Sequence, residues 1–284
     1  TPGFSGSVFT GLARFQRTKF LNGVDFTEAK FSGEKGADFW RAIFSGEREA
    51  NFDDAEFSGK GLASVRGVIF SGKGGVNFNR AEFSGKWGTS FYRAKFFGEK
   101  EANFSDAQFL NGINFKWTIF DCEGGTSFNR THFSGKGAAE FSNVTFSSKN
   151  GTSFLGTIFD NQEETNFSDA HFLGAGKTLF KDIFFKEETL VWFNSINMDS
   201  PENLQFVDVH TLGRVLFLYT DLEKISFKNV NFHQTRHWFF NRESLADERT
   251  DELFPEGTKD ECNVNYYNHL EILYRQLKVN FETQ

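Results

Sequence analysis

Phenylalanine recurs along the chain at steps that alternate between five and eight residues. Steps of this kind keep no single stripe on a helix of 3.6 residues per turn, so they exclude an amphipathic helix over this region. A step of five and a step of eight together make a repeating unit of 13 residues. Near the ends of the chain the step of eight shrinks to six or five. In the middle of the chain the central positions are Phe52, Phe57, Val65, Phe70, Phe78, Phe83, Phe91, Phe96, Phe104 and Phe109.

A small or β-branched residue stands two positions before each central Phe, as at Ala50, Val76 and Thr89. Two inward residues that flank one outward residue are typical of a strand, but here the alternation lasts only three residues. The pattern therefore predicts very short strands joined by turns, with a core made almost entirely of Phe. From Phe4 to Phe232 there are 38 central positions, of which 34 are Phe, and the exceptions are Val65, Met198, Thr211 and Leu222.

Residues 50–54 (Ala-Asn-Phe-Asp-Asp) and 102–106 (Ala-Asn-Phe-Ser-Asp) resemble the consensus of the pentapeptide-repeat family. The resemblance covers residues 2–232 and implies an all-β solenoid, a right-handed four-sided β-helix in which four pentapeptides form one coil. This chain departs from the family pattern because three residues are inserted after every second pentapeptide. We therefore expect 13-residue double units, about 26 residues per coil, and widened loops at two opposite corners, in a rod about 45 Å long.

A column of charges distinguishes a 26-residue coil from a 13-residue coil. With the longer coil, Asp54, Arg80 and Asp106 lie above one another, about 4.8 Å apart, and Arg130 joins them after a shortened step at Phe115. The signs then alternate along the column. A 13-residue coil would instead place like charges side by side, so the sequence favours the 26-residue coil.

The Phe pattern ends after residue 232, and the remaining chain predicts a cap. We expect a β-helix over 1–232, an irregular capping segment over 233–262 and an amphipathic helix over 263–284, where Leu270, Leu273 and Leu277 recur at helical spacing. Such a helix would cover the unpaired strand edges of the last coil. Residues 273–282 also resemble a segment of bacterial pentapeptide-repeat proteins that precedes further helices or membrane spans, which implies membrane association through sequence beyond Gln284.

No motif for catalysis or cofactor binding is present. The chain contains no G-x-S-x-G, phosphate-binding loop, dinucleotide fingerprint or HExxH. His233, His237, Cys262 and His269 match no common metal spacing. We therefore expect no enzyme activity, no catalytic residue, no cofactor and no metal.

Charge and exposed aromatic residues instead indicate contacts with a protein. The formal net charge is −7, with both signs interspersed, so we expect no nucleic acid partner. Lysines recur in the inserted loops and predict two basic ridges, which either keep the protein soluble or dock an acidic partner. Outward aromatic side chains are better contact candidates. The candidate partner-contact residues are Trp40, Trp87, Tyr92, Trp117, Lys60, Lys73 and Lys86.

Two functions remain open from the sequence. The first is a structural or protein-interaction scaffold, part of or docked to a larger assembly, in the cytoplasm or on the cytoplasmic side of a membrane. The alternative is a DNA mimic that regulates a topoisomerase or another nucleic-acid enzyme, as in the fluoroquinolone-resistance pentapeptide proteins that have a similar repeat. A continuous negative face along the rod would favour mimicry, and mixed faces would favour a scaffold. The partner and the oligomeric state are not determined by the sequence.

Overall fold

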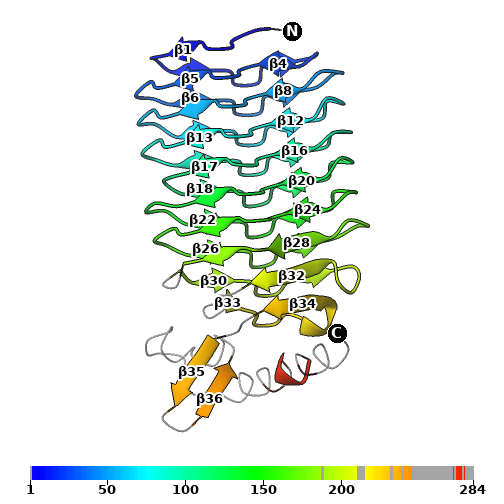
Figure 1. Cartoon of the computed structure of the whole chain (residues 1–284). Helices are drawn as coiled ribbons and strands as arrows, with labels where there is room; N and C mark the ends of the chain where they lie inside the picture. Colours follow the sequence, from blue (N-terminus) through cyan, green and yellow to red (C-terminus); the bar gives the residue numbers. More distant parts are fainter. Residues whose placement is uncertain are drawn as a thin grey trace.

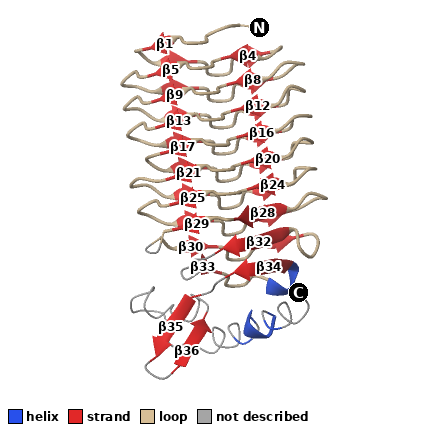
Figure 2. Cartoon of the chain, in the orientation of Figure 1, coloured by secondary structure: helices blue, strands red, loops and turns tan. Residues whose placement is uncertain are grey.

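The chain folds into a stack of four-sided coils, which Figure 1 shows from the N-terminal end downward. Each strand pairs in parallel with the equivalent strand of the next coil, so four sheets run along the rod, and the red arrows of Figure 2 mark those in view. Parallel strands in successive coils bury the Phe side chains between the sheets. This computed structural model describes residues 2–186, 189–209 and 215–230, the backbone of 233–237 and 240–244, and residues 271, 273–276 and 278.

The first and second sheets meet at a corner made of loops. The first sheet contains β1 (Val8–Phe9), β5 (Lys30–Phe31), β9 (Glu56–Phe57), β13 (Glu82–Phe83), β17 (Gln108–Phe109), β21 (His132–Phe133), β25 (Ile158–Phe159) and β29 (Phe184–Phe185). The second sheet contains β2 (Ala13–Arg14), β6 (Ala37–Asp38), β10 (Ala63–Ser64), β14 (Thr89–Ser90), β18 (Ile113–Asn114), β22 (Ala139–Glu140), β26 (Thr165–Asn166), β30 (Val191–Trp192) and β33 (Val215–Leu216).

The third and fourth sheets also meet at a corner made of loops. The third sheet contains β3 (Lys19–Phe20), β7 (Ile43–Phe44), β11 (Ile69–Phe70), β15 (Lys95–Phe96), β19 (Ile119–Phe120), β23 (Thr145–Phe146), β27 (His171–Phe172) and β31 (Asn197–Met198). The fourth sheet contains β4 (Val24–Asp25), β8 (Ala50–Asn51), β12 (Val76–Asn77), β16 (Ala102–Asn103), β20 (Thr126–Ser127), β24 (Thr152–Ser153), β28 (Thr178–Lys181), β32 (Leu204–Val209) and β34 (Ile225–Val230).

The strand register confirms the predicted coil length. Ala50 pairs with Val76, and Val76 pairs with Ala102, so each partner lies one full coil of the expected length further along the chain. Where a loop is shorter, the coil shortens with it, as between Thr89 and Ile113. Shortened loops change the length of a coil without disturbing the four stacked sheets, because every strand still faces its equivalent in the next coil.

The core consists of four columns of stacked rings. In one column Phe52 and Phe78 stack with centroids 4.7 Å apart and planes 11° from parallel. Neighbouring columns meet edge to face, as Phe78 and Phe91 do at 5.5 Å and 90°. Both geometries match the preferred arrangements of aromatic pairs. The predicted Phe core is therefore confirmed, and Val65 takes the place of a ring in its column, 3% exposed.

The corners alternate between tight turns and longer loops. At the turn corners, which join the second sheet to the third and the fourth to the first, the chain changes direction within two residues. The second turn residue has a positive φ even where it is not glycine, for example 55° at Asp54, 54° at Arg41 and 57° at Arg93. Backbone hydrogen bonds to the next coil hold this conformation, and Asp54 N donates to Asn79 O at 3.0 Å. The turn residues thus project outward in two regular columns.

The C-terminal residues that the structure describes close the last coil. A 3-10 helix, η1 (Leu222–Lys224), precedes β34, and residues 271, 273–276 and 278 are helical. Leu273 is fully buried in the core, while the Gln276 side chain donates to Asp221 Oδ1 at 3.1 Å and accepts from Leu222 N at 3.0 Å. The C-terminal helix therefore contacts the last coil as expected of a cap.

The stretch between the β-helix and this helix differs from the expectation. Part of the segment predicted to be irregular forms an antiparallel pair, β35 (His233–His237) with β36 (Phe240–Ser244). A β-hairpin forms between neighbouring residues and does not require the Phe spacing of the coils. The end of the Phe repeat therefore gave no indication of it. The central positions expected at Thr211 and Phe232, and most of the helix predicted for 263–284, lie outside the described residues.

Candidate binding groove on the second sheet

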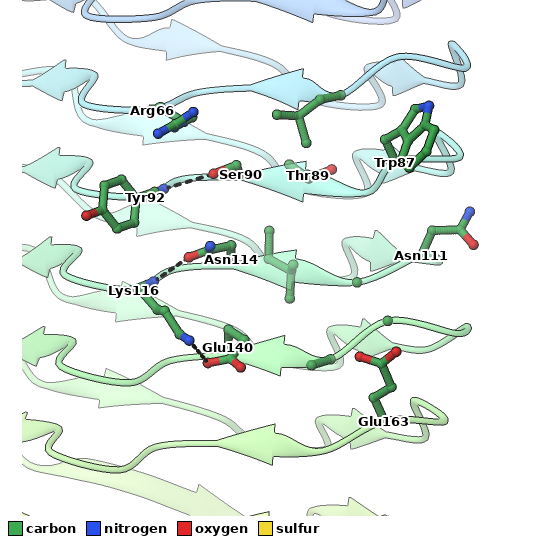
Figure 3. A pocket seen from close by; sticks show the side chains of 15 residues that line it. Arg66, Trp87, Thr89, Ser90, Tyr92, Asn111, Asn114, Lys116, Glu140 and Glu163 are labelled. Atoms are coloured by element: carbon green, nitrogen blue, oxygen red, sulfur yellow. Dashed lines mark hydrogen bonds and ion pairs between the residues drawn. The ribbon is translucent and has the colours of Figure 1, made fainter.

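A groove of about 670 Å³ crosses the second sheet over three successive coils. Its floor is formed by β14, β18 and β22, and Figure 3 shows the side chains that line it. Loops at one side and tight turns at the other side form the walls. The groove therefore lies on paired strands and is bounded by side chains from both corners of the sheet. Its walls and floor include Arg66, Trp87, Ser90, Tyr92, Asn114 and Glu163.

A shortened loop opens this groove. The loop before β18 contains only residues 110–112, whereas the loops before β14 and β22 contain the five residues 84–88 and 134–138. The Asn111 side chain donates to Ser84 O at 3.0 Å and holds the short loop against the longer one. A Cβ on Gly88 would lie 2.7 Å from Gly112 O, so only glycine allows this approach. The missing residues leave a notch in the row of loops, beside the floor.

Aromatic side chains stand on both sides of the floor. Trp87 comes from the loop before β14 and is 71% exposed. Tyr92 comes from the turn after β14, and Figure 3 shows it at the opposite side of the strand from Trp87. A large aromatic side chain loses much water-accessible area when a partner covers it. Trp87 is therefore the large apolar side chain of this groove that is most available to a partner.

The floor offers polar groups held in fixed positions. Ser90 Oγ accepts from Tyr92 N at 3.4 Å, and Asn114 Oδ1 accepts from Lys116 N at 2.9 Å. Because Asn114 uses its oxygen in this way, its NH2 group remains a donor for a bound molecule. Lys116 Nζ pairs with Glu140 Oε2 at 3.1 Å. The floor thus combines hydroxyl, amide and paired charges on rigid backbone, which suits recognition by hydrogen bonds.

The turn corner beside the groove carries arginines stacked on aromatic rings. The guanidinium carbons of Arg17 and Arg41 each lie 4.8 Å from the Trp40 ring centroid. The guanidinium carbons of Arg66 and Arg93 lie 5.5 Å and 5.1 Å from the Tyr92 ring centroid. We call these six residues the arginine edge. They lie at one corner because successive turns of the rod stack on each other.

At the opposite turn corner the arginines are paired with aspartates. Arg80 donates to both carboxylate oxygens of Asp54 at 2.7 Å and 2.6 Å, and Arg130 binds Asp106 in the same way at 2.7 Å and 2.6 Å. The hydrogen bond from Arg80 lowers the pKa of Asp54, and the hydrogen bond from Arg130 lowers the pKa of Asp106. The column of alternating signs expected from the sequence is therefore confirmed.

Glutamates of the preceding coil pair with two of the loop lysines that the sequence places in basic ridges. Lys60 Nζ lies 2.6 Å from Glu34 Oε1, and Lys73 Nζ lies 3.0 Å from Glu47 Oε1. In both pairs the glutamate belongs to the loop one coil earlier. Lys86 Nζ instead lies 5.8 Å from the centroid of the Trp87 ring. Stacking therefore offsets the charge of Lys60 and Lys73, and the prediction from lysines alone did not include these glutamates.

The structure brings some of the predicted contact residues together and separates others. Trp87 and Tyr92 line the groove, Lys86 lies beside it, and Trp40 belongs to the arginine edge. Trp117 is 52% exposed at the same turn corner, one coil further along, while Lys60 and Lys73 lie at opposite loop corners. Sequence reasoning missed Arg66, Ser90 and Asn114. The shortened step between Phe109 and Phe115 was the signal that could have located the groove.

A second hollow, of about 580 Å³, lies between loops of the third and fourth sheets. Glu47, Glu99 and Lys73 are among its lining residues, and Lys73 forms an ion pair with Glu47. Within the described part of the chain, no group of three or more His, Cys, Asp or Glu side chains is arranged to hold a metal ion. In the same part, no helix is both long and apolar enough to cross a membrane.

Comparison with known proteins agrees with this geometry. Parallel two-residue strands, a stacked Phe core and four flat sheets define a four-sided β-solenoid, a class of rigid repeat protein. The family described as "Pentapeptide repeats (9 copies)" matches residues 4–47, and the same repeat continues through the later coils. The chain is a pentapeptide-repeat protein. No curated protein matches it. The fold is consistent with a structural or interaction scaffold, and proteins with this fold are in general non-catalytic.

Proposed function

We propose that this protein is a non-catalytic scaffold that binds a partner protein across the groove on the second sheet. The observation that carries the proposal is the exposed Trp87 beside a polar floor on a rigid ladder of strands. Trp, Tyr and Arg dominate the binding energy of protein interfaces, and here all three line one groove. Because the floor is already ordered, little conformational entropy is lost when a partner binds.

The distribution of charge supports a scaffold over DNA mimicry. A DNA mimic needs a continuous acidic surface that imitates a row of phosphates. Among the described residues, the outward positions of the fourth sheet are neutral at Asn51, Asn77 and Asn103. The adjacent turn corner alternates in sign, and the arginine edge is positive. The faces are therefore mixed, as expected of a scaffold that docks onto a larger assembly.

The test is an affinity purification from the source cells, with the recovered proteins identified by mass spectrometry. Wild type is compared with Trp87→Ala and with Phe184→Ala. Phe184 is also an exposed aromatic residue, 48% accessible, but it lies on the first sheet. We expect one set of proteins to be recovered by wild type and by Phe184→Ala, and to be lost with Trp87→Ala.

Two results would contradict the proposal. If all three proteins recovered the same set, the groove would not be the binding site. If a topoisomerase were recovered and inhibited by the purified protein, DNA mimicry would be favoured instead. Each variant is first checked by circular dichroism, because a misfolded rod would lose every partner at once.

A further inference from the structure

The arginine edge consists of two consecutive clusters along one corner of the rod. Arg17 and Arg41 both contact the Trp40 ring, and Arg66 and Arg93 both contact the Tyr92 ring. Four successive coils therefore each present one guanidinium group at this corner. Stacking of the strands sets their spacing at about 4.8 Å per coil. The row continues into the groove, because Arg66 and Tyr92 also line its wall, as Figure 3 shows.

These four arginines form no ion pair with any carboxylate in the described part of the chain. The arginines of the opposite turn corner differ, because Arg80 and Arg130 are both bound to aspartates. Asp38, the nearby acidic residue of the second sheet, accepts hydrogen bonds from Gln16 and from Trp40 N. The two turn corners therefore differ: the arginines of one are paired with aspartates, and the four arginines of the other form no ion pair among the described residues.

Stacking on the rings leaves the arginines ready to bind an anion. A guanidinium group that is held over an aromatic ring by cation–π attraction does not use its N–H donors for that contact, so they remain able to bind an anion. These donors match the two oxygens of a carboxylate. The ring also restricts the side chain, so less conformational entropy is lost on binding. The arginine edge is therefore a row of preorganised oxyanion sites.

We propose that the arginine edge binds an acidic, extended segment of the partner protein. This inference rests on the proposed function, since it names the chemistry of the partner at the same site. Four coils span roughly 15 to 20 Å, which an extended peptide covers with about five or six residues. A DNA duplex fits less well, because it carries about one charge per 1.7 Å and is repelled more strongly by a protein with a net charge of −7.

Fluorescence anisotropy of a labelled octaglutamate peptide tests the inference at low ionic strength. We expect wild type to bind the peptide, and the double variant Arg41→Gln/Arg66→Gln to bind roughly ten-fold more weakly. The matched control is Arg80→Gln/Arg130→Gln, which removes the same charge from the opposite turn corner and should weaken binding less than about two-fold. The variant Trp40→Leu/Tyr92→Leu retains all four arginines and should lose binding several-fold, because their side chains are no longer held.

Three results would overturn the inference. They are no binding by wild type, an equal loss in both arginine double variants, or tighter binding of an eight-nucleotide oligothymidylate than of octaglutamate. The affinity purification separates this inference from the proposed function. If the partner is lost with Trp87→Ala but kept with Arg41→Gln/Arg66→Gln, the scaffold role stands and the acidic segment is wrong. If octaglutamate binds but no partner depends on Trp87, the arginine edge stands and the binding role of the groove is wrong.

Discussion

At the scale of single residues, each position of the coil has its own physical requirement. The central position takes Phe because a ring can stack on the ring of the next coil and meet the adjacent columns edge to face. The small inward position takes Ala or Thr. At several Thr positions the hydroxyl donates to a carbonyl of the preceding coil, as Thr131 does to Phe104 O at 2.7 Å. These hydroxyl groups are thus satisfied without a second polar side chain.

Removal of a central ring should destabilise the rod strongly. Phe91 is fully buried and contacts Phe78, Phe104 and Phe115 at 5.5, 5.6 and 4.9 Å between centroids. We expect Phe91→Ala to lower the free energy of unfolding by about 3–5 kcal/mol. Urea unfolding followed by circular dichroism measures this. The control Trp117→Ala should change stability by less than about 0.5 kcal/mol, and an equal cost for both variants would contradict the Phe-column account.

The arginine–aspartate pairs should make the free energy of unfolding depend on pH in the acid range. Arg80 and Arg130 lower the pKa of Asp54 and Asp106 in the folded state. A lowered folded pKa stabilises the fold above the unfolded pKa, near 4, and this contribution is lost as pH falls through the folded pKa. We expect Arg80→Gln/Arg130→Gln to reduce the loss of stability between about pH 4 and 2. Urea midpoints across this range measure the effect.

The control for acid dependence is Arg41→Gln/Arg66→Gln, since those arginines bind no described carboxylate. It should follow the wild-type pH profile. If both double variants changed the profile equally, the effect would come from net charge and not from the bidentate pairs. Both pairs are at the surface, so the measurement is made at low salt, where screening is weakest.

At the scale of elements, loop length determines where the surface is hollow. The register fixes the positions of the strands, so the strands do not move to fill the space that a shorter loop leaves. The same three letters, Leu-Asn-Gly, form the short loops 21–23 and 110–112, at the two different loop corners. Only the second of these lies beside Trp87 and Tyr92. The groove therefore arises where this short loop lies beside two aromatic side chains.

Lengthening the short loop should remove the groove but not the fold. We expect insertion of Lys-Gly after Asn111 to restore a five-residue loop, to leave the circular dichroism spectrum unchanged and to abolish recovery of the Trp87-dependent partner. The matched control is the same insertion after Asn22, in a loop of identical sequence at the other loop corner. Retained partner binding after the Asn111 insertion would show that the partner binds elsewhere.

At the scale of the whole molecule, the rod is modular because every coil contacts only its neighbours. The unit that can be removed is set by register: Ala139 pairs with Thr165, so the interval between these two positions is one complete coil. The end coils of the rod must be covered by other residues, because an uncovered coil exposes unpaired strand edges. Leu273 and Gln276 cover the last coil, which ties the C-terminal helix to the stability of the rod end.

Deletion of one whole coil should be tolerated. We expect removal of residues 141–166 to give a folded rod that is shorter by about 4.8 Å, as measured by small-angle X-ray scattering. Removal of residues 141–160 is the control, because it shifts every later Phe out of its column and should give an unfolded or aggregated protein. Equal behaviour of the two deletions would contradict the 26-residue register.

The sequence by itself determined the repeat, the Phe core, the coil length and the balanced column of Asp54, Arg80, Asp106 and Arg130. These follow from a local period that every coil obeys, so the pattern can be read along the chain. It also singled out Trp40, Trp87 and Tyr92, because aromatic residues at outward positions depart from the repeat. It did not predict the positive φ at Asp54, Arg41 or Arg93.

Only the tertiary structure decided which side chains meet across coils. Lys60 pairs with Glu34 and Lys73 with Glu47, in each case from the preceding coil, so the charge of these two loop lysines is offset. Arg66 likewise reaches the Tyr92 ring of the next coil, and the notch at residues 110–112 is hollow only relative to the longer loops on either side. Such contacts depend on differences between neighbouring coils. A repeat fixes where residues stack, whereas the particular side chains that stack there determine charge, shape and binding.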